Sequence, residues 1–170
     1  MKQILTTTAL ILTLAFTAFS QQQTIKLGHI NSADLMRAMP ELEQADRELQ
    51  QTVAEAEAAY RTMMSELQNL MQEFQANQTQ WSDLIRTTRI RAIQDLEQRI
   101  QDFEQQSQRE LEFLQQSLMT PIIERARRAI EDVARENGFT YIFDTSGGML
   151  LFAADSDDIL PLVKRKMNLN

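Results

Sequence analysis

Few residues of this sequence are suited to acid–base or nucleophilic chemistry. His29 is the only histidine, and cysteine is absent. A serine–histidine–aspartate arrangement therefore has one candidate histidine, and thiol catalysis, disulfides and thiolate metal sites are excluded. His29 falls in a predicted strand, where a structural role is the better interpretation. We expect no catalytic residue, no metal site and no enzymatic activity.

Two short motifs carry ligand chemistry in some proteins, but their spacing here favours structural roles. Asp155, Asp157 and Asp158 supply carboxylates of the kind that bind calcium, yet the glycine and glutamate positions of an EF-hand are not filled. We interpret these aspartates as the acidic start of a helix, where they oppose the helix dipole. Gly147-Gly148 fits a turn between strands better than a phosphate-binding loop. The sequence therefore predicts no cofactor.

The side chains best suited to binding another protein lie toward the outer end of a long helical segment. Methionine thioethers are flexible and adapt to varied apolar partners, and arginine side chains attract acidic segments. The alternatives are packing between helices for the apolar residues and simple solvation for the arginines. Our candidate binding residues are Met64, Phe74, Trp81, Arg86, Arg89 and Arg91.

Apolar residues recur at steps of three and four along two stretches in the middle of the chain. The first stretch covers residues 42–74 and the second covers residues 93–122, each with a heptad pattern. One additional step of four, between Leu49 and Val53, is a stutter that locally unwinds a coiled coil. Two rods of matched length, joined by a lapse at residues 76–82, predict an antiparallel helical hairpin over residues 41–121.

The segments on either side of the hairpin carry strand and short-helix signals. Residues 24–31 alternate as in a strand, and Ser32 is placed to cap a short helix that ends before Pro40. Pro121 is expected to break or kink the return helix. A further helix, starting at residue 122, is predicted to end at the C-cap signal Asn137-Gly138.

The C-terminal part is predicted to add two strands and a helix. Residues 139–144 and 149–153 are typical of the strands of a β-hairpin, and residues 159–167 of a helix. We assign residues 24–40 and 122–170 to a head that buries little core alone, so self-association is favoured. The predicted fold class is α+β, mostly α, with a long antiparallel coiled-coil hairpin projecting from a small β-containing oligomerisation head.

The N-terminus has the features of a cleaved secretory signal. Lys2 supplies a positive charge, the apolar run Ala9–Phe19 is too short to span a bilayer, and small residues precede a cut after Ser20. We therefore assign residues 1–20 to a signal peptide and expect a periplasmic protein. The formal net charge of −7 gives no support for nucleic-acid binding.

Two segments resemble a known family. Residues 27–41, LGHINSADLMRAMPE, resemble the opening of the Skp family, also called OmpH-type periplasmic chaperones. Residues 136–159, ENGFTYIFDTSGGMLLFAADSDDI, resemble the closing strand pair and helix start of that family. The order of elements and the hairpin length also agree, so the resemblance covers essentially the whole chain after the signal peptide.

The resemblance implies a homotrimer whose helical tentacles enclose a cavity in which unfolded outer-membrane β-barrel proteins are held without ATP. It implies a role in head assembly for Ile25, Leu27, Ile30, Ile142, Leu150 and Phe152. The best-known relatives are strongly basic whereas this chain is acidic, so we assign no lipopolysaccharide site. Contact with a membrane surface is an open alternative that the sequence does not support. The alternative function is that of an oligomeric coiled-coil structural or adaptor protein of the cell envelope.

Overall fold

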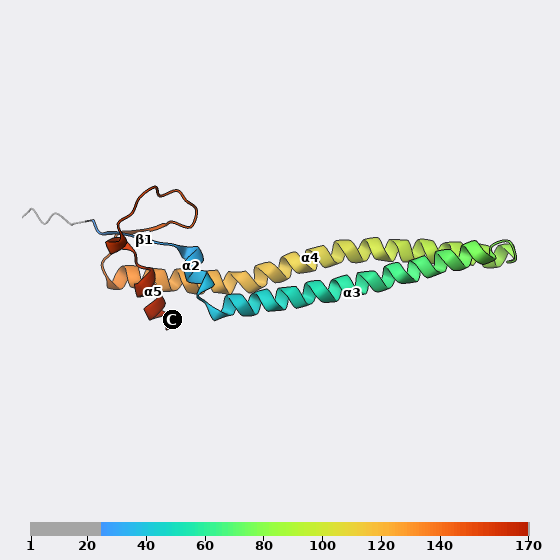
Figure 1. Ribbon diagram of the computed structural model, residues 1–170, viewed down its shortest axis with the longest axis horizontal. Helices are drawn as coiled ribbons and strands as arrows, with labels where there is room; N and C mark the ends of the chain where they lie inside the picture. Colours follow the sequence, from blue (N-terminus) through green and yellow to red (C-terminus); the bar gives the residue numbers. More distant parts are fainter. Residues whose placement is uncertain (1–24, 170) are drawn as a thin grey trace, which may run out of the picture.

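The computed structural model describes residues 25–169, so the expected signal peptide at residues 1–20 lies outside the described residues. Two long helices run antiparallel as a hairpin, and the other elements gather at its base as a small head (Figure 1). The elements in chain order are β1 (Leu27–Ile30), α2 (Ser32–Arg37), α3 (Pro40–Asn77), α4 (Asp83–Glu136), β2 (Tyr141–Asp144), the 3₁₀ helix η2 (Asp155–Asp157) and α5 (Leu160–Lys166). This arrangement confirms the predicted fold class.

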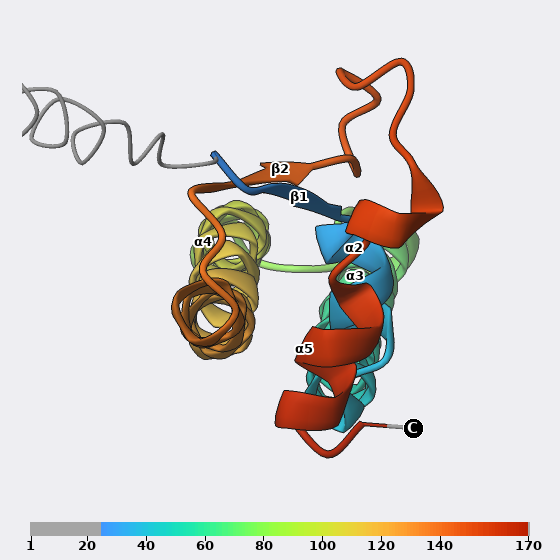
Figure 2. The same cartoon turned by 90° about the vertical axis from the view of Figure 1, so that its left-hand side faces the viewer.

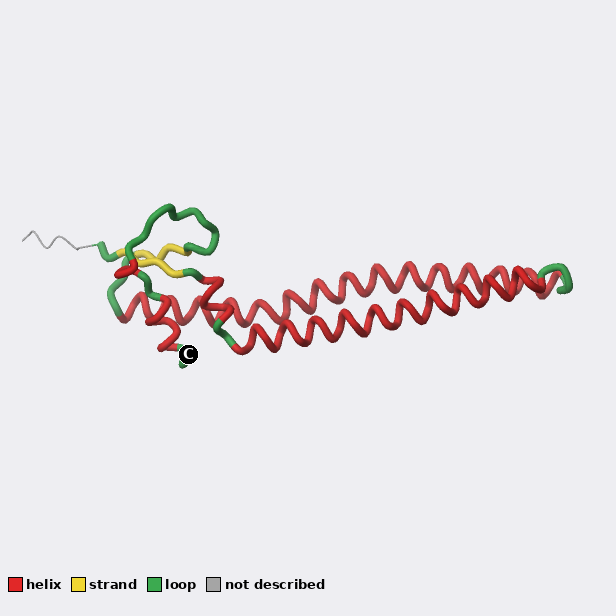
Figure 3. The backbone as a smooth tube through the Cα atoms, viewed as in Figure 1, coloured by secondary structure: helices red, strands yellow, loops and turns green. Residues whose placement is uncertain are grey.

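The hairpin forms because α3 and α4 bury parts of one apolar seam between them. Pro40 begins α3, where its missing N–H leaves no helical hydrogen bond unmade, and Ser82 caps α4. Every residue of the predicted heptad seam is buried or half-buried. At 1.5 Å per residue, the 54 residues of α4 extend about 80 Å. Figure 3 shows the short loop at the tip, where the sequence predicted the chain reversal.

Pro121 does not interrupt α4. The helix continues through it to Glu136, so the predicted break and the separate helix from residue 122 are wrong. An internal proline costs a helix about 3 kcal/mol, and here tertiary packing offsets that cost. Ile122 is buried in the core of the head, and Leu118 packs against the same core. Packing on both sides of Pro121 therefore holds the helix in register.

The sheet pairs β1 with β2 in parallel, with Leu27 opposite Tyr141 and Ile30 opposite Asp144. Parallel strands need a long crossover connection, and the whole hairpin provides it. The predicted returning strand at residues 149–153 is wrong, because this segment is a loop that stands away from the helices (Figure 2). The hydrogen-bonded neighbour of β2 is therefore β1 and not the returning strand.

The helix ends show one capping prediction that is wrong and one that is confirmed. Asn31, rather than Ser32, caps α2, because Asn31 Oδ1 accepts hydrogen bonds from the Ala33 and Asp34 N–H groups at 3.1 and 3.2 Å. Ser32 is the first residue of the helix. At the end of α4, Gly138 has a φ of 71°, a left-handed conformation that glycine adopts without strain. The Asn137-Gly138 cap is therefore present as predicted.

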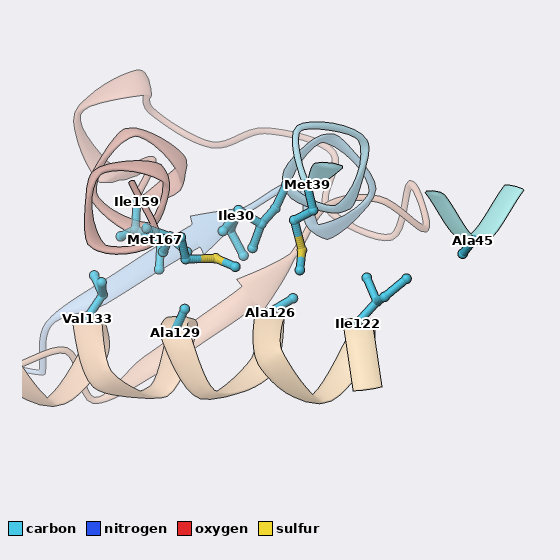
Figure 4. Packing of buried hydrophobic residues seen from close by; sticks show 11 residues of the cluster. Ile30, Met39, Ala45, Ile122, Ala126, Ala129, Val133, Ile159 and Met167 are labelled. Carbon is cyan, nitrogen blue, oxygen red and sulfur yellow. The ribbon is translucent and has the colours of Figure 1, made fainter. Parts of the chain in front are cut away.

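The core of the head lies along one face of α4. Figure 4 shows Ala126, Ala129 and Val133 on successive turns of α4, facing Ile30 and Ile159 across the core. The small alanine side chains let the covering elements approach the helix closely. The buried members are Ile30, Leu35, Met39, Ala45, Ile122, Ala126, Ala129, Val133, Ile159, Val163 and Met167. Among the described residues, no helix combines the length and apolarity needed to cross a membrane.

Candidate binding surfaces

The head exposes large apolar side chains on the outer face of its sheet and on the loop that follows. Side chains alternate along a strand, so Ile30 and Ile142 lie on the core side of the sheet while Leu27, Tyr141 and Phe143 lie exposed. In the loop, Leu151 is 98% exposed and Phe152 is 85% exposed. We call the following residues the head patch: Leu27, Tyr141, Phe143, Met149, Leu150, Leu151 and Phe152.

The loop of the head patch is anchored at both ends. At its start, Asp144 accepts hydrogen bonds from the Ser32 hydroxyl at 2.6 Å, from the Ser32 N–H at 3.2 Å and from the Ser146 N–H at 2.9 Å. At its end, His29 Nε2 lies 3.0 Å from the Ala154 carbonyl oxygen and donates to it. His29 therefore has the structural role that the sequence suggested. The large apolar side chains between the two anchors are exposed to solvent.

Asp144→Asn is expected to destabilise the head at neutral pH and to have no effect in strong acid. Burial raises the pKa of the Asp144 carboxyl, but hydrogen bonds from Ser32 and Ser146 outweigh burial and hold this pKa below its ordinary value of 3.8. A carboxylate with a lowered folded-state pKa stabilises the protein above its unfolded-state pKa. That contribution disappears as the pH falls through the folded-state pKa. Because the group is exposed, we expect a loss below about 1 kcal/mol at pH 7.

Urea unfolding followed by circular dichroism, at neutral pH and at about pH 2, measures this difference. Asp95→Asn serves as the control, because Asp95 is an exposed carboxylate of α4 far from the loop anchor. Equal destabilisation by Asp144→Asn at both pH values would contradict the role assigned to its charge.

A groove opens between α3 and α4 in the half of the hairpin nearest the head. Its volume is about 940 Å³. The seam is buried on either side of it, at Ala45 toward the head and at Leu96 and Ile100 toward the tip. The hairpin groove, as we call it, is lined along the seam by half-buried residues of both helices: Leu49, Val53, Ala56, Tyr60, Phe103, Ser107 and Leu111.

The sequence of the seam explains why the groove stays open. The stutter between Leu49 and Val53 shifts the apolar stripe away from the facing helix, and the short side chains of Ala56 and Ser107 leave space that a leucine would fill. On the rim, the Tyr60 hydroxyl donates a hydrogen bond to the Glu104 carboxylate, which raises the pKa of Tyr60. The groove therefore has an apolar floor and a polar, partly charged rim.

Three of the predicted binding residues contact one another at the tip. The rings of Phe74 and Trp81 meet edge to face with centroids 6.1 Å apart. The Arg89 guanidinium lies 5.6 Å from the centre of the Trp81 ring and forms an ion pair with Glu73 at 3.1 Å. Arg86 pairs with Asp83 on the same helix. The contacts of Phe74, Trp81 and Arg89 link the end of α3 to the start of α4.

The other predicted residues lie apart from this cluster. Met64 is 40% exposed on α3, beside Met71, and Arg91 is exposed on α4. The structure also shows exposed apolar side chains that the sequence analysis missed, most of all Leu84 at the tip and Phe113 on α4, 77% and 73% exposed. The sequence could have indicated their exposure, because neither apolar residue belongs to the heptad seam. Contact of the six predicted residues with another protein stays a prediction.

The acidic segment before α5 has the structural character that its spacing indicated. Asp155 and Asp157 lie in η2, and the Asp158 carboxylate accepts a hydrogen bond from the Leu160 N–H at 2.8 Å, at the start of α5. Within residues 25–169, no group of three or more acidic, histidine or cysteine side chains is arranged to hold a metal ion.

Comparison with known proteins places this fold in a family. The family model for OmpH-like outer membrane proteins matches residues 26–167, which is most of the chain. The chain belongs to the OmpH-like family. The crystal structure of an OmpH-like outer membrane chaperone from Caulobacter crescentus has the same fold, with a TM-score of 0.75, 15% sequence identity and 85% of each chain covered. No curated protein sequence matches the chain.

In this OmpH-like chain, the residues that the family resemblance assigned to head assembly fall into two settings. Ile30 is 2% exposed, and Ile142 packs against the core, so both stabilise the single chain. The other four are exposed, and they are the ones available to a second molecule: Ile25, Leu27, Leu150 and Phe152. Their role in assembly stays a prediction.

Proposed function

We propose that this OmpH-like protein is an ATP-independent holdase that keeps unfolded outer-membrane β-barrel proteins from aggregating in the periplasm. The observation that carries the proposal is the long hairpin whose seam is left open as an apolar groove of about 940 Å³. Membership of the OmpH-like family and the shared fold with a chaperone of that type support it.

The hairpin suits a holding mechanism because holding needs no catalytic group. A protein that binds the unfolded state of a client, and not its folded state, shifts the client equilibrium by mass action. Several weak apolar sites on one rod act together, since binding at one raises the effective concentration at the next. The groove, the exposed Met64 and Met71, and the tip residue Leu84 supply such sites at different distances from the head.

We further propose that several copies join through the head patch, as the homotrimer that the family resemblance implies. Parallel sheets normally have both faces covered, but here the outer face of β1 and β2 lies in water. Leu151 and Phe152 also stand almost fully exposed on the adjoining loop. An apolar surface of this kind on a soluble protein marks an interaction site, and a second and third copy of the head would cover it.

A structural or adaptor role is the second candidate, and the tip is the feature that favours it. Leu84 and Ile85 are 77% and 45% exposed at the end farthest from the head, where they would meet a folded envelope partner first. Cross-linking in cells followed by identification of the captured proteins separates the two roles. A holdase captures many unrelated unfolded proteins, whereas an adaptor captures one folded partner.

Diluting a urea-denatured outer-membrane barrel protein into buffer tests the holdase function by light scattering. We expect the protein to suppress the scattering without nucleotide, and added ATP to change nothing. An equal mass of an unrelated soluble protein is the control. Unchanged scattering at a molar excess of the protein over the barrel would count against the proposal.

A further inference from the structure

The net negative charge of the hairpin lies in the half nearest the head. Residues 41–60 and 101–121 together contain ten acidic side chains and two arginines, which gives this half a net charge of −8. Residues 61–100, which form the outer half, contain five acidic side chains and five arginines and are neutral. All the apolar residues that line the hairpin groove belong to the acidic half.

The rim of the groove repeats this excess of negative charge. Glu57, Glu104 and Glu112 border it, with Arg61 as the single basic residue. Arg61 lies 3.9 Å from Glu57, and both side chains are largely exposed. Glu104 and Glu112 interact instead with the neutral Tyr60 and Gln108. Within residues 25–169, neither Glu104 nor Glu112 forms an ion pair, so two of the three carboxylates have no basic partner on the rim.

We propose that the hairpin groove binds apolar segments of unfolded proteins that carry lysine or arginine beside the apolar residues. This inference rests on the holdase function proposed above and names the segments that one part of the hairpin selects. The apolar side chains of the bound segment displace water from Leu49, Val53 and Phe103 of the groove. The flanking cations reach the carboxylates of the rim while their aliphatic stems cover the apolar walls.

Charge complementarity selects this occupant over the others that an apolar groove admits. A second copy of the hairpin would bring another half with a net charge of −8 against the first, and like charges in contact oppose association. An acidic client segment meets the same repulsion. A cationic apolar segment gains both from burial in the groove and from attraction to its rim.

Two labelled peptides that share one apolar core, with lysines flanking the core in one and glutamates in the other, test the selection. Fluorescence anisotropy with the full protein gives the affinity of each. We expect the lysine-flanked peptide to bind about tenfold more tightly at low salt, with the difference shrinking at high salt because exposed charges are screened. Equal affinities, or no binding of either peptide, would overturn the proposal.

Charge-neutral variants locate the effect. The triple variant Glu57→Gln, Glu104→Gln and Glu112→Gln is expected to remove most of the preference for the lysine-flanked peptide. All three side chains are exposed, so the fold is expected to persist, and circular dichroism checks that it does. An unchanged preference in this variant would place the selection elsewhere and overturn the assignment.

The matched control removes the same number of charges from the neutral outer half. It combines Glu66→Gln, Asp95→Asn and Glu97→Gln, all at exposed positions, and is expected to keep the preference. The aggregation assay keeps this inference separate from the holdase function. Suppressed aggregation with equal peptide affinities would remove the groove assignment alone, whereas unsuppressed aggregation would remove the holdase function together with it.

Discussion

Leu35→Ala is expected to destabilise the protein by roughly 2–5 kcal/mol. Leu35 is 0% exposed and belongs to α2, the short helix that contacts α3, α4 and α5. Shortening the isobutyl side chain to a methyl group leaves a cavity that these helices cannot close, because each is also held by its own contacts in the core. Since small domains are stable by only about 5–15 kcal/mol, this single change removes a large share of the stability.

Urea unfolding by circular dichroism at one fixed protein concentration measures the loss, because association makes stability depend on concentration. Leu84→Ala is the matched control, since it makes the same chemical change at a tip residue that is 77% exposed. We expect the control to change stability by no more than about 0.5 kcal/mol. Equal effects of the two changes would mean that α2 does not pack as described.

Replacing both Leu151 and Phe152 with glutamate is expected to convert the assembled protein to a monomer. At 98% and 85% exposure, neither side chain supports the fold of its own chain. An interface that covers them would have to bury two unpaired carboxylates, and each buried charge costs several kcal/mol. The folded chain should therefore persist while its association is lost.

Light scattering coupled to size-exclusion chromatography gives the mass of each variant. The control places glutamate at Met64 and Met71, which are 40% and 42% exposed on α3 and belong to the outer half of the hairpin. That variant is expected to keep the wild-type mass. A doubly substituted loop variant that kept it too would show that the head patch takes no part in assembly.

The hairpin was predictable from the sequence because its signal is local. Apolar residues of a helical seam recur every few residues, so the position of a residue in the repeat predicts whether it is buried. The seam predicted over residues 42–74 and 93–122 matched the structure throughout. Pro121 failed as a breaker because core packing around Ile122 overrides a local preference. The pairing of β2 with β1 was missed because the whole hairpin separates these strands in the sequence. Gly147-Gly148 instead suggested a turn that would pair β2 with the segment directly after it.

The candidate binding surfaces were predictable in part. The stutter between Leu49 and Val53 and the short side chains of Ala56 and Ser107 can be recognised in the sequence, but periodicity alone does not show that a groove opens there. The contacts among Phe74, Trp81 and Arg89 depend on the path of the turn, which the sequence does not specify. Individual residue types are therefore visible in sequence, whereas the spaces and clusters they form are not.

Photo-cross-linking from within the hairpin groove tests the central claim, that the hairpin holds unfolded proteins, most directly. A photoreactive amino acid replaces Ser107 in the groove, and in a control replaces Ala59, which is exposed on α3 and does not line the groove. We predict a covalent adduct between position 107 and an outer-membrane barrel diluted from urea, and none with the same barrel folded in detergent. An adduct with the folded barrel as strong as with the unfolded one, or no adduct with either, would contradict the account.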